Sequence, residues 1–286
     1  MHTTARSSFF PARLRSTKRA KAPAFALLAG ALFFCLPAFA NVPVTTPPTA
    51  PPSAASSAPQ LFDRTYALPA GGHFFLDNVN GSVWVEGWDQ NKVEVRAIKT
   101  SQNDPSDVDR VKIDVENHTG EVAVHTRYPA GESADVAVEY HIYVPNRVLL
   151  GFVGTVNGSV SVHGVQGRGE LRSVNGNVEV TKSSGRFNAK TTNGNVRLEL
   201  SHLVDGAPMN LETVNGSVVL GLPSNASADL KVHNMNGDVL SDVPVFETLA
   251  LPGARAFQGK LGHGGGEISV RTVNGGIRLL LEQPGV

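Results

Sequence analysis

Residues 213–220 read TVNGSVVL, and six other segments repeat this pattern around an Asn-Gly pair. The other copies are NVNGSVWV (78–85), TVNGSVSV (155–162), SVNGNVEV (173–180), TTNGNVRL (191–198), NMNGDVLS (234–241) and TVNGGIRL (272–279). Successive asparagines lie 77, 18, 18, 22, 21 and 38 residues apart, so the period is close to 20 and the long gaps are near-multiples of it. A fixed period of this length indicates stacked structural units.

The pairs that we identify as structural repeat turns are Asn80 and Gly81, Asn157 and Gly158, Asn175 and Gly176, Asn193 and Gly194, Asn215 and Gly216, Asn236 and Gly237, and Asn274 and Gly275. Asn and Gly tolerate positive φ, so each pair predicts a tight turn. Apolar residues alternate on both sides of it, as Leu211 before the fifth turn and Val218 and Leu220 after it. This alternation is typical of strands with one buried face, and the chain is therefore predicted to be all-β.

Two all-β architectures fit a unit of about 20 residues. One is an antiparallel β-sandwich of hairpins, and the other is a repeat β-solenoid, resembling a parallel β-helix, in which each unit is one coil. We favour the solenoid, because a hairpin accepts Asp-Gly or Gly-Gly as readily as Asn-Gly. Seven asparagines at one corner instead predict a ladder of buried hydrogen bonds, each side chain bonding to the coils about 4.8 Å above and below it.

The chain divides into four regions by composition. Residues 1–40 read as a signal peptide and residues 41–60 as a Pro/Ala/Ser/Thr-rich linker with six prolines and no charge. Residues 61–150 hold nine aromatic residues, including Trp84 and Trp88, and are predicted to be a strand-rich N-terminal cap. Residues 151–286 hold four aromatic residues, all Phe, and form the Asn-Gly repeat body. The cap is not expected to fold as an independent domain, because solenoid ends need an atypical terminal unit.

The first 40 residues predict export. Six basic residues and no acidic ones precede an apolar run at 25–36, and Ala38-Phe39-Ala40 gives the small-x-small pattern of a cleavage site after Ala40. The protein would then lie in the periplasm, at the cell surface or outside the cell. The alternative is an uncleaved N-terminal membrane anchor. The only cysteine, Cys35, lies in this segment, so the mature protein would have no disulfide and no thiolate metal site.

Composition and motifs argue against several kinds of chemistry. Removal of the leader leaves 19 basic against 25 acidic residues, which is unlike a nucleic-acid-binding protein. The histidines show no metal-ligand spacing, and the loop 262–266 lacks the nucleophile motif that an esterase oxyanion loop requires. Asp104, Asp107 and Asp109 lack the rest of a calcium loop and predict a turn or helix cap. We therefore identify no catalytic, cofactor-binding or metal-binding residue and expect no cofactor.

One column of repeat positions bears on an enzymatic alternative. The fourth residue after each Asn is Trp84, Ser161, Glu179, Arg197, Val219, Leu240 or Arg278. A polysaccharide lyase or hydrolase would need clustered acidic residues on such a column, but this one mixes signs. Glu179 and Arg197 are expected to pair between neighbouring coils. We interpret the column as a solvated face.

Three features together resemble a known family. They are VEYHIYVP (138–145), the repeated TVNGSV units and the Gly-rich close FQGKLGHGGGEISVRTVNGGIRL (257–279). In this combination the chain resembles the bacterial putative-adhesin family of β-strand-repeat proteins, a domain of unknown function, over roughly residues 70–282. The resemblance implies a β-solenoid-like body at the cell envelope and offers no catalytic residues. Some relatives are associated with envelope-stress responses.

These observations lead to a hypothesis about function. We expect an exported non-enzymatic protein that acts as a cell-envelope binding, adhesion or scaffold module. Its partner would be an unknown envelope or surface protein or polysaccharide, and not a nucleic acid. The first alternative is an envelope-stress sensor or regulatory module, and a less favoured one is a carbohydrate-active β-helix enzyme.

The C-terminal repeat predicts a second interaction surface. Residues 267–282 are expected to end the stack and to expose Ile268, Val270, Ile277, Leu279 and Leu281 at an open coil. A second copy of the chain would then dock there by strand addition, giving self-association through the C-terminal strand edge. The alternative is that residues 239–265 fold across this end as an internal cap.

Overall fold

The computed structural model describes residues 59–129, 135–204, 206, 208–244, 246–250 and 255–282. The predicted signal peptide, and the predicted linker except for its last two residues, lie outside these ranges. Within them, no helix has the length and hydropathy needed to cross a lipid bilayer.

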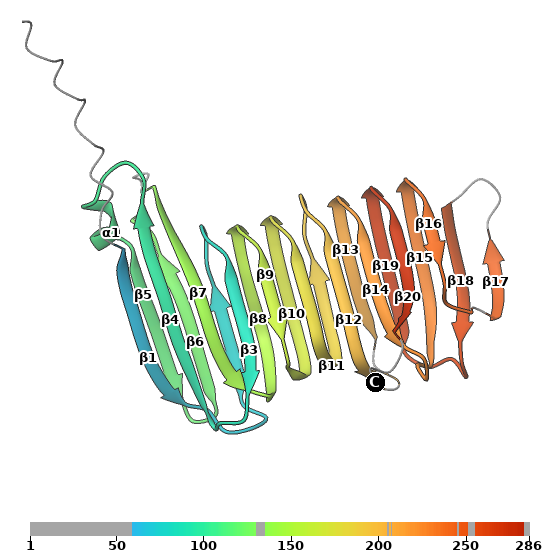
Figure 1. The fold of residues 1–286 in the computed structure, drawn as a ribbon, viewed down its shortest axis with the longest axis horizontal. Helices are drawn as coiled ribbons and strands as arrows, with labels where there is room; N and C mark the ends of the chain where they lie inside the picture. The colour runs from blue at the N-terminus through green and yellow to red at the C-terminus, as the bar shows by residue number, and fades with distance from the viewer. Residues whose placement is uncertain are drawn as a thin grey trace, which may run out of the picture. The chain divides into compact units, whose positions relative to one another are not determined.

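The repeats fold into a β-solenoid, which confirms the predicted fold class (Figure 1). Each coil comprises a strand of one sheet, an Asn-Gly corner and a strand of a second sheet, and neighbouring coils pair in parallel. We call the sheet that precedes the corners sheet II and the sheet that follows them sheet I.

Sheet I contains, in spatial order, β1 (Gln60–Ala67), β4 (Lys92–Ser101), β7 (Val136–Pro145), β3 (Val83–Trp88), β9 (Val160–His163), the first part of β11 (Val178–Lys190), β12 (Val196–Leu203), β14 (Val218–Pro223), β20 (Ile277–Glu282) and β16 (Val239–Ser241). Sheet II contains β5 (Lys112–His118), β6 (Glu121–Arg127), β2 (His73–Asp77), β8 (Arg147–Asn157), β10 (Gln166–Asn175), the second part of β11, β13 (Met209–Asn215), β19 (Glu267–Asn274), β15 (Ala228–Asn236), β18 (Arg255–Leu261) and β17 (Phe246–Ala250). The single helix of the described residues, α1 (Asp107–Arg110), connects β4 to β5.

The core lies between the two sheets because apolar residues alternate along each strand. Val83 and Val85 of β3 are buried, and so are Phe74 and Leu76 of β2 in the other sheet. The buried residues of the predicted cap and of the repeat body belong to one cluster. Trp84 and Glu86, at the intervening positions of β3, consequently point to solvent.

Among the strands of the described residues, antiparallel pairing occurs only toward the ends of the stack. At one end β1 pairs with β4, β4 pairs with β7, and β5 pairs with β6, all antiparallel. At the other end β18 pairs antiparallel with β15, and β17 with β18. The predicted antiparallel sandwich therefore describes these ends and not the repeats.

The order of coils in space differs from their order in the sequence. The last repeat, formed by β19 and β20, lies between the fifth and sixth repeats: β19 pairs with β13 and β15, and β20 pairs with β14 and β16. The expectation that residues 267–282 end the stack is therefore wrong.

The apolar residues of the last repeat are correspondingly covered. Ile268, Val270, Ile277 and Leu279 are each at most 1% exposed. β20 pairs with β14 along its whole length and with β16 over residues 277–279, so it is not the terminal strand that the idea of C-terminal self-association assumed. Residues 239–265 instead supply β16, β17 and β18 beyond the inserted repeat, which is closer to the alternative of an internal cap.

Candidate functional site

The fourteen residues of the seven Asn-Gly pairs lie in one column along a corner of the solenoid. Except at Asn80, where the ladder begins, Nδ2 of each asparagine donates to Oδ1 of the preceding asparagine in the column at 2.7–3.0 Å. The spatial order is Asn80, Asn157, Asn175, Asn193, Asn215, Asn274 and Asn236. The predicted ladder is present, but its bonds lie at the exposed surface, so the expectation that they are buried is wrong.

The buried side chains that make hydrogen bonds at this corner lie instead in a neighbouring column, at the position two residues before each asparagine. Thr155, Ser173, Thr191, Thr213 and Thr272 each donate a hydroxyl hydrogen bond of 2.8–3.0 Å to a glycine carbonyl oxygen of the adjacent corner. All five are at most 5% exposed. Asn78 and Asn234 occupy the same column in the other two repeats, and their amides also donate to corner glycine carbonyls. This explains why the repeat has Thr, Ser or Asn at this position.

The glycines of the corner are required by the close approach of the stacked turns. At Gly275 a Cβ atom would lie 2.0 Å from the carbonyl oxygen of Gly216, and φ is +155°. Gly276, the next residue, would place a Cβ at an ordinary 3.5 Å from Asp238 O, and other repeats have Ser, Asn or Asp there. The Asn-Gly column is thus a structural spine, and chemistry must be sought elsewhere.

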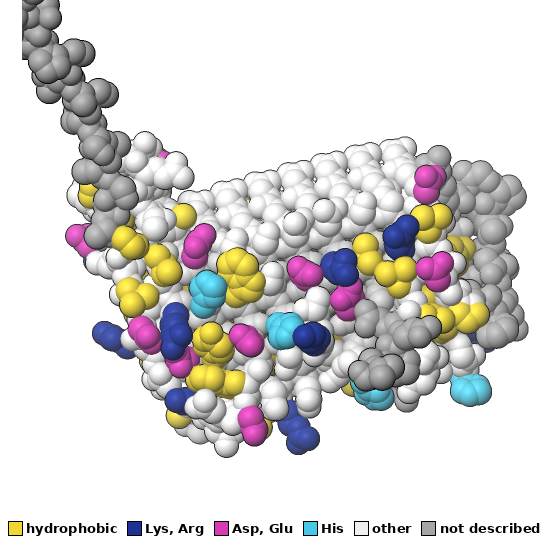
Figure 2. All heavy atoms as spheres, viewed as in Figure 1, with side chains coloured by type: hydrophobic (Ala, Val, Ile, Leu, Met, Phe, Trp, Pro, Cys, Tyr) yellow, Lys and Arg dark blue, Asp and Glu magenta, His cyan; other side chains and the backbone are white. Residues whose placement is uncertain are grey.

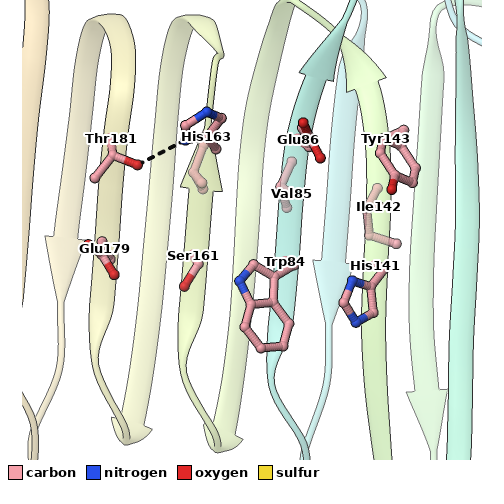
Figure 3. A pocket seen from close by; sticks show the side chains of 11 residues that line it. Trp84, Val85, Glu86, His141, Ile142, Tyr143, Ser161, His163, Glu179 and Thr181 are labelled. Carbon is pink, nitrogen blue, oxygen red and sulfur yellow. Dashed lines mark hydrogen bonds between the residues drawn. The ribbon is translucent and has the colours of Figure 1, made fainter.

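The site that the geometry offers is a shallow groove on the outer face of sheet I. Its cavity volume is ≈350 Å³. We call it the Trp84 groove and define it by eight outward side chains: Trp84, Glu86, His141, Tyr143, Ser161, His163, Glu179 and Thr181. Figure 3 shows them in two rows, with Trp84 between His141 and Ser161 in one row and Glu86, His163 and Thr181 in the other.

The register of four parallel strands builds these rows. Trp84 of β3 lies opposite His141 of β7 on one side and Ser161 of β9 on the other. Ser161 in turn lies opposite Glu179 of β11. Because each of these strands has a partner on both sides, the outward side chains stand at fixed spacings of about 4.8 Å. The rows are therefore held by the sheet and not by loops.

Aromatic rings gather at the end of the groove formed by β3 and β7. The Trp84 ring stacks on His141, with centroids 5.0 Å apart and an interplanar angle of 18°, and remains 48% exposed. Trp88 stacks on Tyr143 at 5.3 Å. Cations cover this second pair: Lys92 Nζ lies 5.2 Å from the Trp88 centroid, and Arg96 Cζ lies 5.5 Å from that of Tyr143. Trp84 thus retains the open aromatic surface.

Polar groups line the rest of the groove. His163 Nδ1 and Thr181 Oγ1 are hydrogen-bonded at 3.1 Å. Glu179 pairs with Arg197 at 3.7 Å, as the sequence predicted, and Arg197 also pairs with Glu199. Glu86 is exposed, and among the described residues it has neither a hydrogen-bond partner nor an ion-pair partner. The groove therefore offers one open carboxylate, one shared carboxylate and several neutral donors and acceptors.

This arrangement suits non-covalent recognition. An exposed indole provides an apolar platform, and groups that accept or donate hydrogen bonds surround it. Groups of three or more His, Cys, Asp or Glu side chains placed to hold a metal do not occur in the part of the chain that the structure describes. Figure 2 shows acidic and basic side chains interspersed on the face in view, without a large patch of one sign.

The other residues singled out in the sequence have local structural contacts. The Asp104 carboxylate accepts hydrogen bonds from the backbone N–H and the hydroxyl of Ser106, and these bonds lower the pKa of Asp104. Asp107 pairs with Arg110 within α1, and Asp109 accepts a bond from Gln60 of β1. The Gly-rich residues 262–266 connect β18 to β19. These aspartates and the Gly-rich loop therefore lie outside the groove.

Sequence reasoning listed Trp84, Ser161 and Glu179 in one column but interpreted it as a solvated face. It missed the groove because His141 and Tyr143 come from β7, which carries no Asn-Gly copy. One signal was available. Trp84 is the only aromatic residue in its column, and the residue that follows it there is a serine, whose small side chain leaves space beside the ring.

Comparisons with known proteins identify the family. A family model described as Toastrack DUF4097 matches residues 77–280, which confirms the resemblance seen in the sequence. No curated protein matches the chain.

Several solved structures are similar over most of their length. A putative cell adhesion protein from Clostridium sporogenes ATCC 15579 is 14% identical, with 78% of this chain and 100% of that chain covered and a TM-score of 0.45. A putative adhesin from Bacteroides fragilis NCTC 9343 is 9% identical, with 77% and 97% covered and a TM-score of 0.38. A putative lipid binding protein from Parabacteroides distasonis ATCC 8503 is 9% identical, with 79% and 95% covered and a TM-score of 0.30.

Proposed function

The chain belongs to the Toastrack DUF4097 family, and from this premise we propose that it is an exported, non-enzymatic binding module of the cell envelope, serving adhesion or scaffolding. The observation that carries the proposal is the Trp84 groove. It combines a half-exposed indole with unshared hydrogen-bonding groups on an outer face of the solenoid. A large aromatic side chain left in water is the kind of residue that dominates recognition surfaces.

Rigidity supports a role in binding without turnover. β3 and β9 each pair with parallel strands on both sides, and their corners are fixed by the Asn ladder. A groove on such a frame binds without reordering its own backbone, which lowers the entropic cost of association. Parallel stacking also leaves the outer face of sheet I open over many strands, so that a long partner can be accommodated.

The proposed location rests on the leader. The basic segment, the apolar run and the Ala38-Phe39-Ala40 pattern support export, and the uncharged linker after Ala40 would separate the folded body from the export signal. Periplasm and cell surface both agree with this reading.

Cell fractionation and a binding assay test the proposal together. The full chain, expressed with its own leader, should be recovered with the envelope or in the medium. The purified protein should bind saturably to whole cells or isolated envelopes, and Trp84→Ala should weaken that binding. Leu240→Ala is the matched control, because Leu240 occupies the same outward column at the far end of sheet I and is 54% exposed. Recovery in the cytoplasm, or equal binding by both variants, would refute the proposal.

A further inference from the structure

The open surface of Trp84 has a defined size and position. His141 covers the indole on the β7 side, whereas Ser161 occupies the β9 side with the smallest side chain of its row. Glu179 stands one strand further on, about 9.6 Å from β3 at the usual strand spacing. The space above Ser161, between the side chains of Trp84 and Glu179, therefore accommodates one ring of a ligand.

The charges around the groove favour a neutral ligand. Lys92 and Arg96 cover the neighbouring rings of Trp88 and Tyr143 on one side, and Arg197 pairs with Glu179 on the other. A cationic ligand would find only Glu86 as an open carboxylate among the groove residues, because Arg197 already pairs with Glu179 and Glu199, and Arg96 with Glu94 and Asp63. An anionic one would meet the unshared carboxylate of Glu86.

Backbone pairing argues against a peptide bound as an added strand. The strands under the groove, β3 and β9, already have partners on both sides, so their main-chain groups are used. Strand addition needs a free edge. A ligand in this groove is recognised by side chains alone.

We infer that the Trp84 groove binds a neutral saccharide ring, whose apolar face lies against the indole while its hydroxyls bond to Glu86, Glu179 and the His163–Thr181 pair. This assignment rests on the proposed binding function and names its ligand class. A sugar ring has the two kinds of surface that the groove presents: C–H groups for the aromatic platform and hydroxyls that both donate and accept. Carboxylates accept strong hydrogen bonds from hydroxyls. Glu86 can accept such bonds without losing a partner of its own.

The size of the site limits its affinity. One ring on one platform in an open groove is expected to bind with a dissociation constant of about 1 mM. Useful retention at a polysaccharide surface then comes from several chains or several rings binding at once. A suitable assay must therefore detect weak binding directly.

Saturation-transfer NMR with free sugars gives that assay. The panel contains neutral hexoses, N-acetylhexosamines and their β-linked disaccharides, measured against the purified full chain. At least one should bind, and Trp84→Ala should weaken it about tenfold or more. Ser161→Leu should also weaken it, because the larger side chain fills the space between Trp84 and Glu179 while Trp84 remains. Leu240→Ala should bind as the wild type does.

The controls separate this inference from the general function. Both groove variants keep the buried residues of β3 and β9, and circular dichroism should show unchanged folding. If the sugar that binds has a vicinal diol, periodate oxidation of isolated envelopes should abolish binding of the protein; protease treatment should leave that binding intact in either case. Absence of sugar binding by the wild type, or binding by Trp84→Ala or Ser161→Leu as strong as that of the wild type, overturns the inference. If envelope binding then persists and protease removes it, the module binds a protein and the proposed function stands.

Discussion

Two adjacent glycines in the last repeat allow the spine to be tested with a minimal change. Gly275→Ala adds a Cβ atom 2.0 Å from Gly216 O and 2.5 Å from Gly216 C, both of them backbone atoms. Ordinary contact begins at 3.4 Å, so the two corners must separate by about 1.4 Å. A flexible side chain could move aside, but a strand paired on both sides cannot do so without breaking its ladder.

The cost follows from the bonds that cross this contact. Gly216 N–H donates to Asn274 O at 2.8 Å, and Val218 N–H donates to Gly276 O at 2.9 Å. A separation of about 1.4 Å takes both beyond hydrogen-bonding distance. Overpacking costs about 1–3 kcal/mol and each lost bond about 1 kcal/mol. We expect Gly275→Ala to lower the free energy of unfolding by about 3–5 kcal/mol.

Gly276→Ala is the matched control, one residue away in the same corner. Its Cβ would lie 3.5 Å from Asp238 O and 3.9 Å from Ser217 Oγ, which is ordinary packing. Replacing a glycine by alanine without strain stabilises a protein by about 0.4–1 kcal/mol through the unfolded chain. Urea unfolding followed by far-UV circular dichroism measures both variants. Equal unfolding midpoints for Gly275→Ala and Gly276→Ala would refute the close-approach argument.

Three further predictions concern the hydroxyl column, the inserted repeat and a buried lysine. Thr191→Val removes the buried hydroxyl donor to Gly176 O and should lower the free energy of unfolding by about 1–2 kcal/mol. Thr192→Val, at a partly exposed neighbour with no such bond, should lower it less. Urea titration of both variants measures this difference. Deletion of 267–282 should abolish cooperative unfolding, because it removes the coil that pairs with repeats on both sides; an unchanged urea midpoint would contradict the insertion. Lys99 is 8% exposed and donates to two backbone carbonyls, and desolvation, with a smaller effect of Lys112, lowers its pKa. The unfolded chain then binds more protons as pH rises toward the ordinary lysine value of about 10.4, so wild-type stability relative to Lys99→Met should rise in that range. A pH-independent difference in melting temperature between the two proteins would count against this assignment.

The sequence alone determined the elements of this fold. The Asn-Gly pairs set the corners, because few other residues fit a turn whose glycine approaches the next corner so closely. The alternation around Leu211 and Val218 determined which faces are buried, because side chains along a strand alternate between its faces. The period near 20 predicted coils. Together these local signals were sufficient for an all-β solenoid with one polar spine.

Only the tertiary structure decided which coils are neighbours. The corners carry nearly the same residues in every repeat, so local interactions cannot distinguish Asn274 from Asn236 as the partner of Asn215. The insertion of the last coil depends on long-range pairing, which the sequence period does not encode. The groove depends on it in the same way, because Trp84 meets His141 only through the pairing of β3 with a strand from outside the repeat. The repeated sequence determines the kind of contact between neighbouring coils, whereas long-range strand pairing in the folded chain determines which coils are neighbours.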